Sequence, residues 1–287
     1  MRLWRRPTPA VTQIQQFLDP ASWRDHRFGL PESRWRALSG QTAWITGAGT
    51  GYGRSIAVAL AAAGARVVLS SRRAEKLQDS IEEMRTLGVP TENASVLPLD
   101  ITDPAAVEAA AAEFRRRYGA PHSLIHSAAV SSGGISWPLT SMTGGQWDRI
   151  LTTNVTGSWL MCRFAVPDML AAGACRVVLL TSEAGWASTP GVGAYNVSKS
   201  AVNNLGASLA AECAARYPNA DVQINVLIPG EARTEMNTRS TLSPYTVVPM
   251  TLALVSHPKG GPNGRFFHRD GRHFSFAYAE AYDRPLL

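Results

Sequence analysis

The 287-residue sequence is poor in cysteine, in charged residues and in long apolar runs, and each shortage argues against a class of protein. Its three cysteines, Cys162, Cys175 and Cys213, are too few and too widely spaced for a disulfide framework or a zinc site. We expect them to be small buried residues. No apolar run reaches the ~18–20 residues that a membrane-spanning helix needs. We therefore expect no metal site and no membrane span.

We also expect no signal peptide, and the sequence has no concentrated basic patch. Proline and polar residues follow the arginines at positions 2, 5 and 6, where a signal peptide needs an apolar stretch, so we expect a cytoplasmic protein. The net charge is +6, but the basic residues are scattered and almost all arginine. The longest run, Arg115, Arg116 and Arg117, falls at the end of an expected helix, where cations are favoured. We expect no nucleic-acid partner; an anionic cofactor or substrate explains the positive charge more simply.

From residue 40 onward, short β-branched or apolar segments alternate with longer Ala-rich segments of helical period. The expected strands cover residues 42–46, 66–71, 95–99, 123–127, 177–182, 222–227 and 265–268. Continuous apolar strands separated by helices are typical of a parallel sheet covered on both faces. We predict an α/β domain over residues 40–287, with a doubly wound, Rossmann-type sheet of about seven strands and a short C-terminal extension. Ligands should bind at the carboxyl ends of the strands.

Residues 1–39 stand outside this alternation and form an N-terminal arm. Their aromatic residues, which include Trp23, Phe28 and Trp35, are too many for a typical disordered tail. A short amphipathic helix is expected over residues 11–18, ended by Asp19-Pro20. The arm should pack on its own domain or on a neighbouring subunit, and we assign it no chemistry.

A glycine-rich loop, Thr46-Gly47-Ala48-Gly49-Thr50-Gly51-Tyr52-Gly53, lies between the first expected strand and an Ala-rich helix. Glycines let the backbone approach a pyrophosphate, whose charge meets the free N–H groups of the helix start. A tight turn alone would also use glycines. The strand before and the helix after favour the phosphate cradle.

The second expected strand ends in Ser70-Ser71-Arg72-Arg73, with no acid until Glu75. An NAD site places an Asp or Glu here to bind the ribose 2′-hydroxyl, whereas arginine accommodates the 2′-phosphate of NADP. The two arginines could instead belong to an exposed loop. Their position favours NADP(H) as the cofactor.

Tyr195 and Lys199 are spaced i and i+4 at the start of an expected helix, so both side chains can reach one cleft. A free tyrosine has a pKa near ~10, too high for efficient proton exchange at neutral pH. A cation at about 4 Å could contribute roughly 4 kcal/mol at an effective dielectric of about 20. We therefore predict that Lys199 lowers the pKa of Tyr195. Ser182 adds a hydroxyl at the carboxyl end of the fifth strand, and Asn154 lies in the preceding helix.

These motifs resemble those of the short-chain dehydrogenase/reductase family over residues 40–271. Gly47-x-x-x-Gly51-x-Gly53 is similar to its glycine loop, Ser182 stands 13 residues before Tyr195 as in its catalytic pair, and Asn154-x-x-Gly157 matches its Asn-x-x-Gly. The resemblance implies that Tyr195 is the general acid/base, that Lys199 also binds ribose hydroxyls, that Ser182 holds the substrate oxygen, and that Asn154 connects Lys199 to a proton relay through water.

The resemblance also implies a cofactor site with further members. Asp100 matches an acid that contacts adenine, and Pro229, Gly230 and Thr234 match a stretch beside the nicotinamide. The full predicted cofactor set is Gly47, Gly49, Thr50, Gly51, Tyr52, Gly53, Ser71, Arg72, Arg73, Asp100, Ile101, Ser127, Ala128, Ala129, Tyr195, Lys199, Pro229, Gly230, Ala232 and Thr234.

One motif departs from the family pattern. His126-Ser127-Ala128-Ala129 stands where the family has Asn-Asn-Ala-Gly. We expect His126 to be a hydrogen-bonded core residue, and the change at Ala129 puts cofactor affinity in doubt rather than the reaction class.

The predicted function is hydride transfer between NADP(H) and a carbonyl or secondary alcohol. A 3-oxoacyl thioester reductase and a non-catalytic cofactor-binding scaffold remain as alternatives. Trp137, Trp186, Met236 and Tyr245 could line an apolar substrate pocket, or equally belong to the core or a dimer contact. Glu183 and Glu231 could instead favour a polyol or a cationic group, or face solvent.

The family resemblance also implies a homodimer or homotetramer that forms through the helices carrying Asn154 and Tyr195. The second of these contains Ala207, Ala210 and Ala211, which would permit close approach of two helices.

Overall fold

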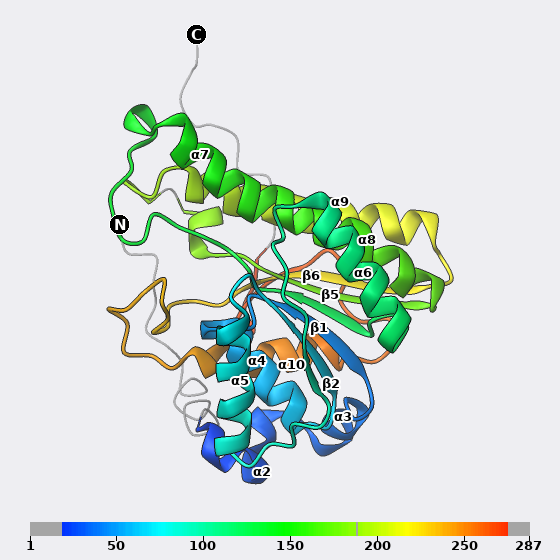
Figure 1. Ribbon diagram of the computed structural model, residues 1–287. Helices are drawn as coiled ribbons and strands as arrows, with labels where there is room; N and C mark the ends of the chain where they lie inside the picture. The colour runs from blue at the N-terminus through cyan, green and yellow to red at the C-terminus, as the bar shows by residue number, and fades with distance from the viewer. Residues whose placement is uncertain (1–18, 188, 275–287) are drawn as a thin grey trace.

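The computed structural model describes residues 19–187 and 189–274, which form an α/β sheet with helices on both faces (Figure 1). The strand order is β3-β2-β1-β4-β5-β6-β7-β8, with parallel pairing throughout except between β7 and β8. The strands are β1 (Thr42–Thr46), β2 (Arg66–Ser70), β3 (Ala94–Val96), β4 (Ser123–His126), β5 (Ala174–Leu180), β6 (Asp221–Ile228), β7 (Phe266–His268) and β8 (His273–Phe274). The predicted doubly wound sheet is confirmed, with one short antiparallel strand added at its edge.

Two groups of helices sandwich the sheet (Figure 1). One face carries α4 (Gly51–Ala62), α5 (Ala74–Thr86) and α10 (Val248–Val255), and the other carries α6 (Pro104–Tyr118), α8 (Gly157–Ala171) and α9 (Ala194–Arg216). Shorter elements are α2 (Trp23–His26), α3 (Glu32–Ala37), α7 (Gly144–Leu151), the 3-10 turns η2 (Pro20–Ser22), η3 (Arg27–Gly29), η4 (Leu139–Ser141), η6 (Glu183–Gly185) and η7 (Pro244–Val247), and the π-helical turn η5 (Thr152–Thr156).

Strand β1 shows how one sequence supplies both halves of the core. Successive strand residues point to opposite faces, and every residue of β1 is buried. Trp44 stacks on Phe114 of α6 with 4.8 Å between ring centroids, while Ile45 packs on the α4 side with Ile56. A strand covered on both faces must be apolar throughout, and this explains the continuous apolar runs in the sequence.

The part of the N-terminal arm that the structure describes packs on its own domain. Phe28 is fully buried and stacks on Tyr245 of η7, with ring centroids 5.9 Å apart and planes 8° apart. Trp23 donates its indole N–H to the Leu87 carbonyl at 3.2 Å, and Arg34 donates to the Ser256 carbonyl at 3.4 Å. The predicted helix over residues 11–18 lies outside the described residues.

The cysteines are buried and free, as predicted: Cys162 lies in α8, Cys175 in β5 and Cys213 in α9. Burial raises the pKa of Cys162 to about 12, so this thiol is unreactive at neutral pH. Among residues 19–187 and 189–274, no group of three or more His, Cys, Asp or Glu side chains could hold a metal ion. Within the same ranges no helix has the length and apolar character to span a bilayer.

The arginine run at the end of α6 is a solvated helix surface, also as predicted. Arg115 pairs with Asp168 of α8 at 3.0 Å, and Arg116 pairs with Glu113 one turn earlier at 2.9 Å. Exposed pairs of this kind contribute little to stability and offer no concentrated basic patch.

Candidate active site

The glycine loop joins β1 to α4 and brings two backbone segments into close contact. Gly47 has a left-handed φ of 66°, and a Cβ atom there would lie 2.7 Å from the Ala128 backbone nitrogen. A Cβ atom on Gly53 would collide with the Gly47 carbonyl oxygen, so both positions require glycine. The N-cap residue Thr50 makes no side-chain capping hydrogen bond. The first N–H groups of α4 therefore remain available to an anion such as a pyrophosphate.

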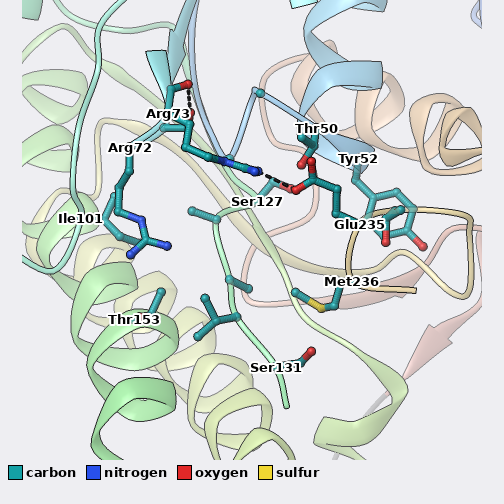
Figure 2. A pocket seen from close by; sticks show the side chains of 18 of the residues that line it. Thr50, Tyr52, Arg72, Arg73, Ile101, Ser127, Ser131, Thr153, Glu235 and Met236 are labelled. Carbon is teal, nitrogen blue, oxygen red and sulfur yellow. Dashed lines mark hydrogen bonds and ion pairs between the residues drawn. The ribbon is translucent and has the colours of Figure 1, made fainter. Parts of the chain in front are cut away.

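A cavity of about 500 Å³ opens in front of this loop, at the carboxyl edge of the sheet (Figure 2). Of the residues predicted to bind the cofactor, it is lined by Gly47, Gly49, Thr50, Gly51, Tyr52, Ser71, Arg72, Arg73, Asp100, Ile101, Ser127, Ala128, Ala129 and Thr234. It is also lined by residues that the motifs did not indicate: Ser70, Leu99, Val130, Ser131, Gly133, Arg149, Thr153, Glu235 and Met236. Its size is in the range of small-molecule and cofactor sites.

The other predicted cofactor residues do not line this cavity: Gly53, Tyr195, Lys199, Pro229, Gly230 and Ala232. The loop after β6 is nevertheless fastened to the glycine loop, because Tyr52 donates its hydroxyl hydrogen to the Gly230 carbonyl at 2.7 Å. Arg269 fixes the same loop from the other side by donating to the Pro229 carbonyl at 3.1 Å. Ala232 is buried within the loop after β6, and its contact with the cofactor stays a prediction.

The two arginines after β2 have different surroundings. Arg73 forms an ion pair of 2.5 Å with Glu235, and Figure 2 shows this pair reaching across the cavity. Arg72 points into the space between Ile101 and Thr153 and has no hydrogen bond or ion pair within the described part of the chain (Figure 2). Arg72 therefore has its guanidinium donors available at the cavity wall.

Asp100 lies across from Arg72. Burial acts to raise the pKa of the Asp100 carboxyl, but hydrogen bonds from Thr102 and the charge of Arg72 outweigh it and lower the pKa below its usual value. The Thr102 backbone N–H and hydroxyl donate to Asp100 at 2.9 and 2.7 Å. A fixed, ionised acceptor of this kind suits the amino group of an adenine.

The structure brings Ser182, Tyr195 and Lys199 together at the ends of β5 and the start of α9. The Ser182 hydroxyl lies close enough to the Tyr195 phenol to act to lower its pKa, and the Lys199 ammonium lies 5.6 Å from the centroid of the Tyr195 ring. Lys199 is buried and donates to the Leu180 carbonyl at 3.1 Å. Two hydroxyl groups and a cation thus converge from two elements on one point.

Burial dominates the electrostatics of this group. It raises the pKa of Tyr195 to about 12, although the hydrogen bond with Ser182 opposes the rise and the Glu183 carboxylate adds to it. It lowers the pKa of Lys199 from 10.5 to about 8. The predicted lowering of the Tyr195 pKa by Lys199 is not found in this arrangement, because burial is the largest cause of the Tyr195 shift and Lys199 is not among its causes.

Asn154 lies within the π-helical turn η5, between α7 and α8. Its amide accepts from the Val130 N–H at 2.8 Å and donates to the Val130 carbonyl at 2.9 Å and to the Ser198 hydroxyl at 3.0 Å. The side chain therefore fastens the loop after β4 to α9. Its amide contacts Val130 and Ser198, and the connection to Lys199 through water that the family resemblance implies stays a prediction.

His126 is buried and neutral. Its Nδ1 lies 2.8 Å from the Thr46 hydroxyl, while its Nε2 has no hydrogen-bond partner among the described residues. Burial, assisted by the charge of Lys199, lowers its pKa to about 3. Its interpretation as a hydrogen-bonded core residue is confirmed.

The four residues that the sequence suggested for the substrate pocket lie in different surroundings: Tyr245 and Trp186 pack against other aromatic rings, Met236 lines the cavity, and Trp137 lies in a loop. Tyr245 is buried under Phe28 and donates to Glu83 at 2.6 Å, so it belongs to the core. Trp186 packs edge-on against Phe266 with centroids 5.1 Å apart. Met236 lines the cavity, and Trp137, in the loop after β4, is half-buried. The structure therefore removes Tyr245 from the predicted substrate wall and keeps Met236 at the cavity, while the roles of Trp137 and Trp186 stay predictions.

A charged cluster beside Ser182 was not predicted from the motifs. Glu183 Oε1 lies 3.5 Å from His268 Nε2, and His268 Nδ1 lies 2.7 Å from Asp270 Oδ1. No local pattern could indicate this, because Glu183 lies in η6 while His268 ends β7 and Asp270 follows it, and folding alone brings these segments together.

Comparison with known proteins agrees with this geometry. Residues 41–243 match the family model for short chain dehydrogenases. The chain is 32% identical over 203 residues to gluconate 5-dehydrogenase of Gluconobacter oxydans, covering 71% of this chain and 75% of that protein. It is 31% identical over 208 residues to NADPH-dependent aldehyde reductase 2 of Arabidopsis thaliana, covering 69% of this chain and 75% of that protein.

Solved structures show the same architecture. A putative short chain dehydrogenase from Pseudomonas syringae superposes with a TM-score of 0.74 at 25% identity, over 82% of this chain and 96% of that one. The family match covers the glycine loop, the Ser182–Tyr195–Lys199 group and the loop after β6. The chain therefore belongs to the short-chain dehydrogenase/reductase family and is an oxidoreductase.

Proposed function

We propose that this chain transfers a hydride between NADP(H) and a carbonyl or secondary alcohol. The observation that carries the proposal is the convergence of the Ser182 hydroxyl, the Tyr195 phenol and the Lys199 ammonium at the carboxyl edge of the sheet. The cavity in front of the glycine loop has helix N–H groups without a side-chain cap, and among the described residues its Arg72 makes no hydrogen bond or ion pair; both features suit the diphosphate and 2′-phosphate of such a cofactor. The bound cofactor would supply or accept the hydride.

The chain's own residues would handle the substrate oxygen and its proton. Ser182 and Tyr195 present two hydroxyl donors to one oxygen, which polarises a carbonyl. With a pKa of about 12, the phenol is protonated at neutral pH and can donate its proton to the alkoxide that forms on reduction. The Lys199 ammonium would stabilise the negative charge that develops on the phenol oxygen.

Cofactor choice should depend on Arg72. A guanidinium pairs with a 2′-phosphate through charge-assisted hydrogen bonds, while NAD offers only a hydroxyl there. Hydrogen bonds to charged groups contribute roughly 1.5–3 kcal/mol, so we expect about 10- to 100-fold preference for NADPH over NADH. The Arabidopsis relative is NADPH-dependent by name.

The experiment is a fluorescence titration of both cofactors against wild type and Arg72→Ala. The variant should bind NADPH about 10- to 100-fold more weakly and NADH almost unchanged. Arg116→Ala, which removes an exposed guanidinium on α6, is the matched control and should change neither affinity. Equal affinities in the wild type, or equal losses in the variant, would refute NADP(H) preference.

We also propose that the chain forms a homodimer or homotetramer through α8 and α9. Trp159 on α8 and Val197 on α9 are large apolar side chains with exposures of 44% and 38%. Ala210, which the sequence suggested for close helix approach, is buried in the core and does not contribute. Light scattering at micromolar concentration should show an oligomer, and a monomer there would contradict this assignment.

A further inference from the structure

An ion pair between Arg73 and Glu235 connects the two loops that flank the glycine loop. The Arg73 guanidinium and the Glu235 carboxylate are 2.5 Å apart, although Arg73 follows β2 and Glu235 lies in the loop after β6. Both residues line the cofactor cavity, and Figure 2 shows their side chains meeting across it. Their side chains are 52% and 51% exposed, and so exposed a pair adds little to folding stability. A role in binding explains its place over the cavity better than a role in folding.

The loops that carry the pair pack on neighbouring glycines of the glycine loop. A Cβ atom on Gly49 would lie 3.3 Å from the hydroxyl oxygen of Ser71, in the loop after β2. A Cβ atom on Gly51 would lie 3.0 Å from the methyl group of Thr234, in the loop after β6. The ion pair therefore spans the segment from Gly49 to Gly51, where α4 begins with N–H groups that its N-cap side chain leaves available.

The other cations near the glycine loop have different places. Arg54 and Lys76 line a neighbouring cavity of about 440 Å³, and both pair there with an aspartate of α5. In the cofactor cavity Arg149 belongs to α7, and Arg72 points to the π-helical turn that follows α7 (Figure 2). Of these five cations, Arg73 is the one whose side chain extends across the start of α4.

We propose that Arg73 binds the diphosphate of the cofactor, and that Glu235 is the positioning residue that holds its guanidinium over the start of α4. This inference rests on the proposed function and names a binding residue of that same site. Arg73 would then contact NADPH and NADH alike, because the diphosphate is common to both. The choice between the two cofactors would remain with Arg72.

The Arg73 guanidinium has donors left for phosphate oxygens. It carries five N–H groups in a planar fork, and it donates to Glu235 through one terminal nitrogen, Nη2. The N–H groups at the start of α4 and a guanidinium above them favour the same ligand, because both attract an anion. Glu235 neutralises part of the arginine's charge, so the pair serves to place hydrogen-bond donors rather than to create a strong field.

Two fragments of the cofactor separate this assignment from a role at the 2′-phosphate. ADP has the 5′-diphosphate and no 2′-phosphate, whereas adenosine 2′-monophosphate has the 2′-phosphate and no diphosphate. The dissociation constant of each fragment is measured by displacement of bound NADPH, followed by the fluorescence of NADPH. Arg73→Ala should weaken binding of ADP about 10-fold and leave that of adenosine 2′-monophosphate almost unchanged, and Arg72→Ala should do the reverse.

The whole cofactors give a second readout. Arg73→Ala should weaken binding of NADPH and NADH by the same factor, so the ratio of the two affinities should equal that of the wild type. Arg85→Ala is the matched control, because it removes an exposed guanidinium that pairs with Glu82 on α5, away from both cavities. It should change none of the four affinities.

The positioning role of Glu235 has a readout opposite in sign to simple electrostatics. Removal of a negative charge near a diphosphate should by itself tighten binding of ADP. Glu235→Gln keeps an acceptor for Arg73 and should bind ADP at least as tightly as the wild type, whereas Glu235→Ala releases the guanidinium and should bind ADP more weakly. In the Arg73→Ala background, Glu235→Ala should no longer weaken binding of ADP, because no guanidinium is left to place.

Several results would overturn the inference and leave the proposed function intact. Arg73 would lose its assignment if Arg73→Ala bound ADP as tightly as the wild type, or if it weakened NADPH more than NADH. Glu235 would lose its positioning role if Glu235→Ala bound ADP as tightly as Glu235→Gln. The affinity that each arginine variant retains for the other fragment shows that the variant is folded. A folded wild type that binds neither NADPH nor NADH would refute the proposed function, and the inference would fall with it.

Discussion

Lys199 should destabilise the folded protein, and its removal should stabilise the protein while abolishing efficient turnover. Burial lowers the pKa of Lys199 from 10.5 to about 8, so the charged form is disfavoured in the folded state. At about 1.4 kcal/mol per pH unit, this difference corresponds to about 3 kcal/mol at neutral pH. Replacement by methionine keeps a similar volume and forgoes the hydrogen bond to Leu180, worth about 1 kcal/mol. We expect Lys199→Met to raise the free energy of unfolding at pH 7 by about 2 kcal/mol.

The pH dependence gives this prediction its sign. In the unfolded chain the Lys199 amine keeps its proton up to its ordinary pKa of 10.5, whereas in the folded protein it loses the proton above about pH 8. The unfolded state therefore binds more protons than the folded state between pH 8 and 10.5. Wild-type stability should rise through that window relative to Lys199→Met, and the advantage of the variant should disappear by its upper end. Below pH 8 the difference in unfolding free energy between Lys199→Met and wild type should be constant.

Urea unfolding of both proteins at pH 7, 8, 9 and 10, followed by circular dichroism, would measure this difference. Lys259→Met, at an exposed position, is the control and should leave stability unchanged at every pH. A methionine variant at position 199 that is no more stable than wild type at pH 7, or a difference independent of pH, would refute the reasoning.

Three further predictions concern the site and its support. Tyr195→Phe should lower turnover by about 100-fold or more and leave NADPH binding nearly intact, because only the proton donor is lost; near-normal turnover in the folded variant would remove Tyr195 from that role. Gly53→Ala should weaken binding of both cofactors in a titration, because its Cβ would displace the Gly47 carbonyl; unchanged affinities would contradict the tight loop. Phe28→Ala should lower the unfolding free energy by about 3–5 kcal/mol with kcat little changed, and a loss of kcat in the folded variant would instead connect the arm to the site.

Local patterns in the sequence were sufficient for much of the fold and for the cofactor cradle. Each strand–loop–helix unit carries its own apolar period, and the glycine loop is a contiguous segment between β1 and α4. The resemblance to the family also paired Ser182 with Tyr195, and in the structure Ser182 acts on the pKa of the Tyr195 phenol. The boundaries were less certain: the third strand, expected over residues 95–99, runs over Ala94–Val96, because pairing with β2 rather than composition decides where it ends.

Contacts between distant segments could not be read from the sequence. From the sequence, Tyr245 was a candidate aromatic residue of the substrate pocket. In the structure its ring stacks on Phe28 of the N-terminal arm and is buried in the core. Arg73 and Arg72 are adjacent and chemically equivalent in the sequence, yet only Arg73 meets Glu235. These differences depend on where the loop after β6 and the N-terminal segment come to lie.

The sequence by itself predicted the fold class and the family, because these depend on periodicity and on the spacing of contiguous motifs, and the resemblance to the family implied the catalytic roles proposed for Ser182, Tyr195 and Lys199. The tertiary structure decided which groups surround the candidate active site and, with them, the direction of its pKa shifts. Burial, rather than the Tyr195–Lys199 spacing, sets both of their pKa values, and the meeting of Glu183 with His268 across β6 sets the charge beside Ser182. Desolvation and long-range pairing both depend on what surrounds a residue in space, and no local pattern encodes that.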